Sequence, residues 1–305
     1  MQKLSNHQIS AELIGAYLYQ IPLNMPLKLA RGTHDLRRGV LLKFATEQGE
    51  KWGEAAPLYG FSFESLEQVI AAARALQFEK NLNIQNLPPS LQFAFDMAQT
   101  AIPTVQSKLQ QAQLVTQNSP FNLAEATTHC AKLKISPQTA QHDLQLINQL
   151  AKTTVQIRLD GNRQFSLRQA LNFAAAIQNP AQIAFFEEPC ATLEQTKIFA
   201  EQSGCKVALD ESLTHFNGDF VAFPNIAALI CKPTLIGSLR RCESMFEFAC
   251  LHDLQFVISS CFESATGFDF LQNLAMFWAA DTIHGLDTQK YLRHSEQKLE
   301  LLWHR

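Results

Sequence analysis

The segment VQIRLDGNRQFSLRQALNFAAAIQNPAQIAFFEEPC (155–190) decides the fold. It opens with an apolar run that ends at Asp160 and closes with a second apolar run that ends at Glu187. Between the two runs Ser166 can cap a helix whose apolar residues share one face: Leu167, Ala170, Leu171, Ala174 and Ile177. The order strand, helix, strand predicts two parallel strands that are joined by a crossover helix.

The same unit repeats along the chain. Further strands are predicted at 131–136, 206–210, 228–232, 256–260 and 282–285, and the Gln-rich stretch 110–118 is an ambiguous eighth. Eight parallel strands are the number of a closed barrel. A doubly wound open sheet fits the alternation too, but no Gly-rich turn follows a first strand. The sequence therefore favours the α/β class and a modified TIM barrel.

The first hundred residues show a different pattern. Strands are predicted at 12–23, 39–46 and 51–55, and helical spacing follows at 64–76 and 89–101. These elements do not alternate as βα units, so they predict a separate α+β domain ahead of the barrel.

Composition excludes several classes of protein. The chain has 305 residues, 47% of them hydrophobic, and a formal net charge of -3, which argues against nucleic acid or an anionic membrane as the main partner. No apolar run reaches the length of a membrane span, and the polar N-terminus does not resemble a signal peptide, so a cytoplasmic location is expected. Seven cysteines without a Cys-x-x-Cys pair predict neither a zinc site nor a disulfide framework. Cys190 and Cys261 lie beside polar motifs, but no histidine base lies near them in the sequence.

Charged residues stand where the predicted strands end. They are Lys132 and Lys134, Asp160, Glu187, Asp210 and Lys232, and the steps between them are each about one βα unit long. Catalytic groups of barrels sit at the C-terminal ends of the strands, so these side chains are expected to share one pocket. Three carboxylates suit Mg²⁺, and a lysine near that cation is biased toward the neutral form that can accept a proton. Each residue alone is more typical of a helix cap or a solvated strand face; their order and spacing favour a site.

The same residues carry a resemblance to a known family. The supporting stretches are WGEAAPLYGF (52–61), KLKIS (132–136), RLDGNR (158–163), FFEEPC (185–190), LDESL (209–213), KPTLIGSL (232–239), VISSCFESATG (257–267) and GLDT (285–288). In this order they resemble the enolase superfamily, in its muconate-lactonizing branch, and within it the o-succinylbenzoate synthases of proteobacteria. The resemblance is most specific after residue 130 and thin between 76 and 130.

The resemblance implies a fold and a domain division. The family fold is an N-terminal α+β capping domain over a modified barrel of seven βα units plus a strand. The expected ranges are 1–104 for the cap, 105–288 for the barrel, and 289–305 for a C-terminal segment that returns to the cap. The stretch 24–38 is expected to form loops over the substrate.

The resemblance also implies roles for the site residues. Asp160, Glu187 and Asp210 are the expected ligands of one Mg²⁺, for which Mn²⁺ can substitute. Lys134 is the expected acid–base residue, Lys132 its electrostatic neighbour, and Lys232 the cation on the opposite face of the substrate. Ser259 and Gly285 match positions that contact a succinyl tail, and Asn162 and Arg158 are expected supporting residues for substrate binding. His284 stands where the family commonly has proline, near the expected tail-binding end, and Cys261 and Phe262 also depart from the common pattern.

The implied reaction is the syn dehydration of 2-succinyl-6-hydroxy-2,4-cyclohexadiene-1-carboxylate to 2-succinylbenzoate, in menaquinone biosynthesis. The partner is then a small-molecule substrate, while the oligomeric state stays open, with a monomer as one option. Two alternatives remain: an N-acylamino acid racemase or dipeptide epimerase of the same superfamily, and a non-catalytic scaffold with the enolase-type fold. The compact length favours the synthase over the first. Three converging carboxylates argue against the second, because they would repel one another without a cation.

Overall fold

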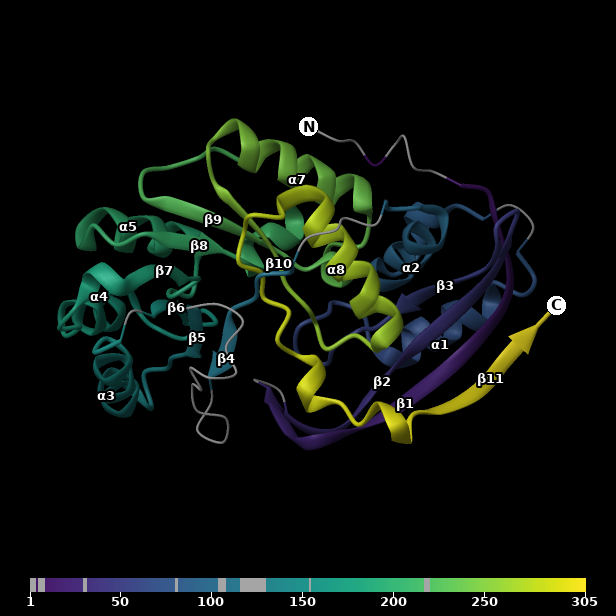
Figure 1. Cartoon of the computed structure of the whole chain (residues 1–305), viewed down its shortest axis with the longest axis horizontal. Coiled ribbons are helices and arrows are strands. Elements are labelled where there is room, and N and C mark those ends of the chain that lie inside the picture. Colours follow the sequence, from purple (N-terminus) through teal and green to yellow (C-terminus); the bar gives the residue numbers. More distant parts are fainter. Residues whose placement is uncertain are drawn as a thin grey trace.

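The computed structural model of the chain describes residues 4, 9–29, 32–79, 82–103, 108–115, 130–153, 155–216 and 220–305. Within these ranges the molecule has two sheets, a four-stranded antiparallel sheet and a seven-stranded parallel sheet with helices around it (Figure 1). No described helix has the length and apolar character that a membrane crossing requires.

The antiparallel sheet forms the cap. Its strand order is β11-β1-β2-β3, and the strands are β1 (Ala11–Leu29), β2 (Gly32–Thr46), β3 (Gly49–Ala55) and β11 (Lys298–His304). The helices α1 (Leu66–Ala75) and α2 (Pro89–Gln99) pack against one face of this sheet, with Val69, Phe44 and Leu91 in a shared core. The last strand, β11, is antiparallel to β1, and the Trp303 indole on it donates a hydrogen bond of 2.6 Å to the Ala73 carbonyl. The C-terminal segment therefore completes the cap sheet.

The hairpin of β1 and β2 corrects one expectation. The stretch 24–38 was expected to be loop, but residues 24–29 and 32–38 continue the two strands, with Leu27 opposite His34. The register shifts between Pro22 and Leu27, which bends the hairpin. Strand pairing prevails here because Met25 and Leu27 can turn their half-buried side chains to the cavity while the backbone on either side of the turn stays paired.

The parallel sheet forms the barrel. Its strands are β4 (Gln113–Val115), β5 (Cys130–Lys134), β6 (Gln156–Asp160), β7 (Ile183–Glu187), β8 (Val207–Leu209), β9 (Ile226–Cys231) and β10 (Gln255–Ile258), which are neighbours in this order. The helices around it are α3 (Ala140–Leu150), α4 (Leu167–Ala175), α5 (Leu193–Ser203), α6 (Pro233–Ile236), α7 (Leu239–Leu251) and α8 (Ala265–Ala279). Ser166 caps α4 in a reciprocal capping box with Gln169, as the sequence predicts. The ambiguous stretch 110–118 contributes the short β4.

The predicted strand at 282–285 is reduced to two bridges. His284 bridges Gln111 beside β4, and Gly285 bridges Ser259 beside β10, both in parallel. The backbone bonds reach both edges: the Ala112 amide donates to the His284 carbonyl at 2.9 Å, and the Gly285 amide donates to the Ile258 carbonyl at 2.9 Å. Two residues are too few for a regular strand, yet they connect both edges of the sheet and close the barrel.

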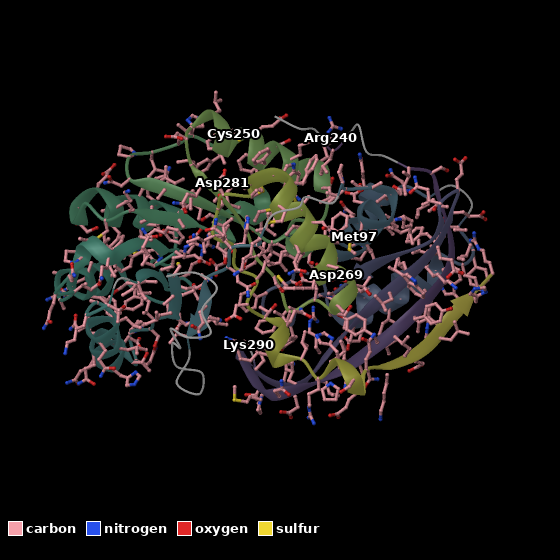
Figure 2. The ribbon with its side chains drawn as sticks, in the orientation of Figure 1. Met97, Arg240, Cys250, Asp269, Asp281 and Lys290 are labelled. Atoms are coloured by element: carbon pink, nitrogen blue, oxygen red, sulfur yellow. The ribbon has the colours of Figure 1, made fainter. Side chains whose placement is uncertain are left out.

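The cap is joined to the barrel by buried groups. Met97 of α2 packs in the same core cluster as Phe93 and residues of α7 and α8, and Figure 2 shows it in the interior beside α8. On β3, the buried Glu54 carboxylate accepts hydrogen bonds from the Ser264 amide (2.8 Å), the Ser264 hydroxyl (2.6 Å) and the Gly267 amide (2.8 Å). These amides belong to the first turn of α8, where a negative charge is stabilised by the free backbone donors.

Candidate active site

Successive side chains of a β-strand point to opposite faces, so every second residue of each barrel strand faces the barrel axis. Phe185, Ala208 and Ile230 fill the barrel interior together with Val257, while their neighbours in sequence pack outward against the helices. Two residues further along each strand come the groups expected at the site: Glu187, Asp210, Lys232 and Ser259. Period and strand direction together place these residues at the C-terminal mouth of the barrel.

Register aligns the groups on three neighbouring strands. Lys134 of β5 is paired with Asp160 of β6, and Asp160 is paired with Glu187 of β7. Asp210 and Lys232 follow the last residues of β8 and β9. All five are therefore at one level of the barrel.

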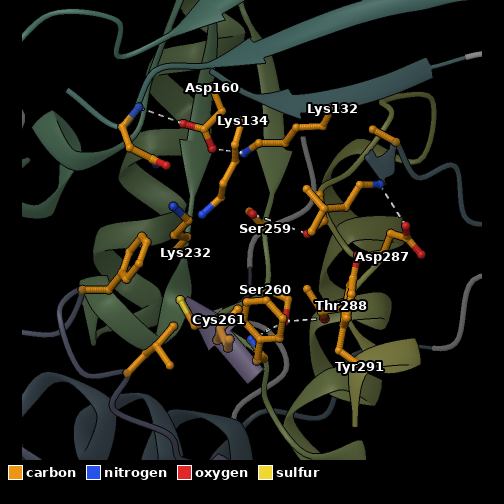
Figure 3. Close-up of a pocket in the computed structure, with 18 of the residues that line it drawn as sticks. Lys132, Lys134, Asp160, Lys232, Ser259, Ser260, Cys261, Asp287, Thr288 and Tyr291 are labelled. Carbon is orange, nitrogen blue, oxygen red and sulfur yellow. Dashed lines mark hydrogen bonds and ion pairs between the residues drawn. The ribbon is translucent and has the colours of Figure 1, made fainter. Parts of the chain in front are cut away.

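A cavity of about 330 Å³ opens at this mouth, between the barrel and the cap. Of the residues expected at the site, Lys132, Lys134, Asp160, Asn162, Lys232, Ser259 and Gly285 line it. The cap contributes Leu23, Met25, Pro26, Leu27, Leu58 and Phe61, and the barrel adds Ser260, Cys261, Phe262, Asp287, Thr288 and Tyr291 among others (Figure 3). The cavity is thus charged on the β5–β9 side and mostly apolar on the cap side.

Two of the lysines are held by carboxylates. The Lys132 amine lies 2.9 Å from an Asp160 oxygen and 2.8 Å from a Glu187 oxygen, and the Lys232 amine is paired with Asp210. Burial lowers the pKa of Lys132 and of Lys232, but the neighbouring carboxylates outweigh it and raise both values, so both amines stay charged. In the part of the chain that the structure describes, no three potential ligand side chains meet at one point, because the carboxylates are turned to these two ammonium groups.

Lys134 differs from the other two lysines. Its amine lies 5.7 Å from the centre of the Phe61 ring, and among the described residues no carboxylate is within ion-pair distance of it. Figure 3 shows the amine ends of Lys134 and Lys232 directed toward each other. Burial lowers the pKa of Lys134, and the charges of Lys132 and Lys232 lower it further, against the opposing effect of Asp160. Lys134 is therefore the amine of the three that is best suited to accept a proton.

The expected substrate contacts divide into two groups. Ser259 and Gly285 lie side by side at the closing bridge, and a Cβ at Gly285 would come within 2.8 Å of the Ser259 hydroxyl oxygen. Asn162 lines the cavity with a positive φ of 40°, and its amide donates to Asp160 at 3.1 Å. Arg158, in contrast, does not line the cavity.

Arg158 lies one layer deeper in the barrel. It is 4% exposed, its guanidinium lies over the Phe185 ring, and it donates a 2.7 Å hydrogen bond to the Ile283 carbonyl. Its position two residues before Asp160 gives it the same inward direction but places it below the mouth. Arg158 thus supports the closing segment rather than touching a ligand in the cavity.

His284 also has a structural place. It is fully buried; its Nδ1 accepts a 3.1 Å hydrogen bond from the Ile258 amide, and its Nε2 lies 3.0 Å from the Ala279 carbonyl. Burial lowers its pKa to about 4, so the ring is neutral and Nε2 carries the proton. The histidine holds the closing bridge and is absent from the cavity lining.

Sequence reasoning missed the second glutamate of the FFEEP stretch. Glu188 is fully buried with a positive φ of 37°, and one of its oxygens accepts from the amides of Asp210 (3.2 Å) and Ser212 (2.9 Å). Its other oxygen accepts a 3.1 Å hydrogen bond from Arg163. Glu188 therefore fixes the backbone that carries Asp210. The strand period was the available signal, since it points two adjacent glutamates in opposite directions.

Comparisons with known proteins agree with this geometry. Residues 121–301 match the family model "Enolase C-terminal domain-like", and residues 12–102 match the model "MenC, N-terminal domain". The o-succinylbenzoate synthase of Pectobacterium atrosepticum is 32% identical over 286 residues, 89% of this chain and 88% of that protein. The o-succinylbenzoate synthase of Yersinia pseudotuberculosis serotype I is 31% identical over 318 residues, 95% of this chain and 98% of that protein.

Solved structures share the fold at lower identity. The o-succinylbenzoate synthase of Thermosynechococcus elongatus, described with Mg in its active site, has a TM-score of 0.72 at 20% identity, with 93% of this chain and 94% of that one covered. A dipeptide epimerase of Enterococcus faecalis has a TM-score of 0.75 at 16% identity, with 93% and 92% covered. The solved structures identify the fold, and the relatives found by sequence identify the family within that fold. The chain belongs to the o-succinylbenzoate synthase family of the enolase superfamily.

Proposed function

We propose that this protein is an o-succinylbenzoate synthase, a Mg²⁺-dependent lyase that dehydrates 2-succinyl-6-hydroxy-2,4-cyclohexadiene-1-carboxylate to 2-succinylbenzoate in menaquinone biosynthesis. The observation that carries the proposal is the pair of amines, Lys134 at the end of β5 and Lys232 after β9, directed toward each other in the cavity. The names of relatives at 31–33% identity over most of the chain support this reaction over others of the superfamily.

Lys134 acts first as base and then as acid. Its lowered pKa favours an amine that takes the proton from the carbon next to the substrate carboxylate. The resulting ammonium returns a proton to the departing hydroxyl, so the C–O bond breaks, water leaves and the ring becomes aromatic. Both transfers occur on one face of the ring, as a syn elimination requires.

Lys232 and Lys132 supply fixed positive charge. Their pKa values are raised by neighbouring carboxylates, so neither competes with Lys134 as a base. Lys232 approaches from β9, and its charge stabilises the anion that forms after proton removal. Ser259, Gly285 and Asn162 are proposed contacts for the substrate, with the first two at the succinyl tail.

The residues at three strand ends fit a divalent cation. Asp160, Glu187 and Asp210 offer hard oxygen donors at one level of the barrel, and each already holds a cationic lysine. Burial, followed by the charge of Asp160, raises the pKa of Glu187, which supports the proposal of a cation at this cluster. Mg²⁺ prefers such donors, and when bound it would offset the negative charge that develops on the substrate carboxylate. Mn²⁺ is a proposed substitute with the same donor preference.

The proposal is tested by a spectrophotometric assay with the cyclohexadiene substrate, with and without Mg²⁺. Conversion to the aromatic product that disappears with chelator is expected. Incorporation of deuterium at the α-carbon of an N-succinyl amino acid, with the cyclohexadiene left unchanged, would assign a racemase instead. If neither activity is detected, the protein is a non-catalytic scaffold with the enolase-type fold. We also propose a cytoplasmic location, which cell fractionation tests.

The ligand set has its own experiment. Asp210→Asn removes one of three negative ligands, so calorimetric titration should show Mg²⁺ binding at least about tenfold weaker. Asp269→Asn, an exposed aspartate on α8, is the matched control and should bind Mg²⁺ as the parent protein does. Equal affinity in the Asp210 variant would contradict the ligand assignment.

A further inference from the structure

Arg37 of β2 carries a buried guanidinium whose hydrogen-bond partners, among the described residues, are all backbone carbonyls. It is 3% exposed and donates to the carbonyl oxygens of Phe262 (2.8 Å), Arg38 (2.7 Å), Pro57 (2.8 Å) and Ala56 (2.5 Å). Burying a charge is costly unless its donors are satisfied, and a planar fork of five donors can satisfy several carbonyls at once. Such an arrangement connects separate backbone segments. An apolar side chain would fill the same space without burying a charge, so packing alone does not explain an arginine here.

One of the connected segments presents Phe61 to the active site. After Pro57 the chain turns: the amides of Phe61 (2.9 Å) and Ser62 (2.8 Å) donate to the Leu58 carbonyl, and Gly60 has a φ of 88° that favours glycine. The turn places the Phe61 ring 5.7 Å from the Lys134 amine and 5.4 Å from the Lys232 amine. An aromatic face attracts ammonium groups, and of these two lysines Lys232 is buried whereas Lys134 is exposed to the cavity.

The other connected segment is the barrel loop after β10. Phe262 lines the cavity with a φ of 62°, a left-handed conformation that a non-glycine residue adopts only when its surroundings impose it. The Arg37 bond to its carbonyl is one such restraint, and the Ser260 hydroxyl, which accepts from the Phe262 amide at 2.9 Å, is another. Arg37 thus bonds to the cap turn and to the barrel wall with one side chain.

We infer that Arg37 is a positioning residue: by holding Ala56 and Pro57 against Phe262, it sets the place of the Phe61 ring over the amines of Lys134 and Lys232. Arg37 itself touches neither amine. The inference rests on the proposed function for its kinetic consequence, whereas its structural consequence, the covering of the buried Lys232 amine, does not depend on any activity.

The consequence for the reaction concerns turnover more than affinity. A displaced ring would let water reach the Lys232 amine and would leave both amines free to change position relative to the ring of a bound substrate. Loss of a precisely held acid–base group lowers kcat, while the contacts that hold the substrate tail at Ser259 and Gly285 are unaffected. We therefore expect kcat to fall about tenfold or more in Arg37→Lys, with KM changed less than about threefold.

The activity-independent experiment measures how well the buried Lys232 amine is covered. The purified protein is treated with formaldehyde and a borohydride reductant, and methylation of each lysine is followed by mass spectrometry. Arg37→Lys and Phe61→Leu should both methylate faster at Lys232 than the parent, by about threefold or more, while the surface Lys152 is unchanged in every protein. Arg38→Lys, the exposed neighbour on the same strand, is the matched control and should resemble the parent.

Coupling between the two positions separates positioning from a general loss of stability. If Arg37 acts through Phe61, the double variant Arg37→Lys/Phe61→Leu is no slower in turnover and no faster in Lys232 methylation than Phe61→Leu alone. Effects that multiply in the double variant would overturn the inference, as would parental kcat and Lys232 methylation in folded Arg37→Lys. Arg37→Gln, which keeps two amide donors, takes its place if Arg37→Lys melts below the assay temperature. A protein without dehydratase activity but with the expected methylation pattern would refute the proposed function and leave the positioning role standing.

Discussion

The barrel mouth and the cap contribute to the same cavity in different ways. At the mouth, charged side chains stand at the ends of successive strands, so one strand period and one direction determine where Lys134, Asp160 and Glu187 point. In the cap, the groups that matter are tied to partners more than 200 residues away in sequence, as Glu54 is to Ser264 and Arg37 to Phe262. The barrel therefore carries the charged groups of the proposed reaction, and the cap positions the side chains that surround them.

The largest effect is expected at the mouth. Lys134→Ala removes the amine that we propose moves the proton, and acid–base groups of this kind contribute about 10²–10⁴ in rate, so dehydration should fall at least about a hundredfold. The fold should be retained, since the amine has no ion-pair partner within the described residues. Steady-state kinetics and a melting curve check both points. Lys152→Ala, a surface lysine of the barrel, is the control, and a Lys134 variant that keeps most of its activity would refute the assigned base.

The next effect tests the joint between the two regions. Glu54→Ala removes a fully buried carboxylate and leaves the Tyr19 hydroxyl and the first turn of α8 without their acceptor. Unsatisfied buried donors cost about 1–3 kcal/mol each, so the free energy of unfolding in urea should fall by about 3 kcal/mol or more. Glu50→Ala on the same strand, an exposed residue paired with Lys43, should cost less than about 1 kcal/mol. An equal loss of unfolding free energy in the two variants would mean that the Glu54 hydrogen bonds between cap and barrel stabilise the protein no more than a surface ion pair does.

A smaller effect depends on pH and concerns the closing bridge. Burial lowers the pKa of His284 from 6.5 to about 4, so the folded protein keeps the ring neutral while the unfolded chain takes up a proton. The unfolded state then binds more protons between these values, and the free energy of unfolding falls as pH drops from about 6.5 toward 4, by about 2 kcal/mol. Urea unfolding at several pH values should show a shallower decline in His284→Asn than in the parent, with the exposed His252→Asn as control. Parallel curves for parent and His284→Asn would contradict this account.

The smallest effect lies where the cap meets α7. Burial raises the pKa of Asp96 to about 6, against the opposing hydrogen bond from the Leu239 amide at 2.7 Å. The folded state therefore holds a proton that the unfolded chain has lost, and stability declines as pH rises from about 4 to 6. Asp96→Asn keeps an oxygen that can accept from the Leu239 amide but removes the charge. At pH 7 the variant should therefore be as stable as the parent, or more stable by less than about 1 kcal/mol. A clear loss of stability would show that the charge itself stabilises the first turn of α7.

Prediction from sequence succeeded where the pattern is local. The parallel sheet, the Ser166 cap and the strand-end positions of Asp160 and Glu187 follow from periodicity over a few residues. It failed where pairing over long distances decides. The strand residues 24–29 and 32–38 were expected as loop because their strand pattern is weak without a partner strand. The strand expected at 282–285 is only a two-residue bridge.

The expected site was incomplete for the same reason. The strand period implies that Arg158 lies one layer below Asp160, yet only the packed barrel shows that its partner is the Ile283 carbonyl. The approach of Phe61 to two lysines depends on a turn that the cap holds in place, and no spacing in the sequence encodes it.

By itself the sequence determined which side chains face the barrel mouth, because alternation along a strand is a property of the backbone and needs no knowledge of the rest of the molecule. Only the tertiary structure decided the state of each group there: which lysine is paired, which is covered by an aromatic ring, and which glutamate holds a loop. Those outcomes depend on burial and on the distances between charges, and both arise only when separate segments of the chain pack together.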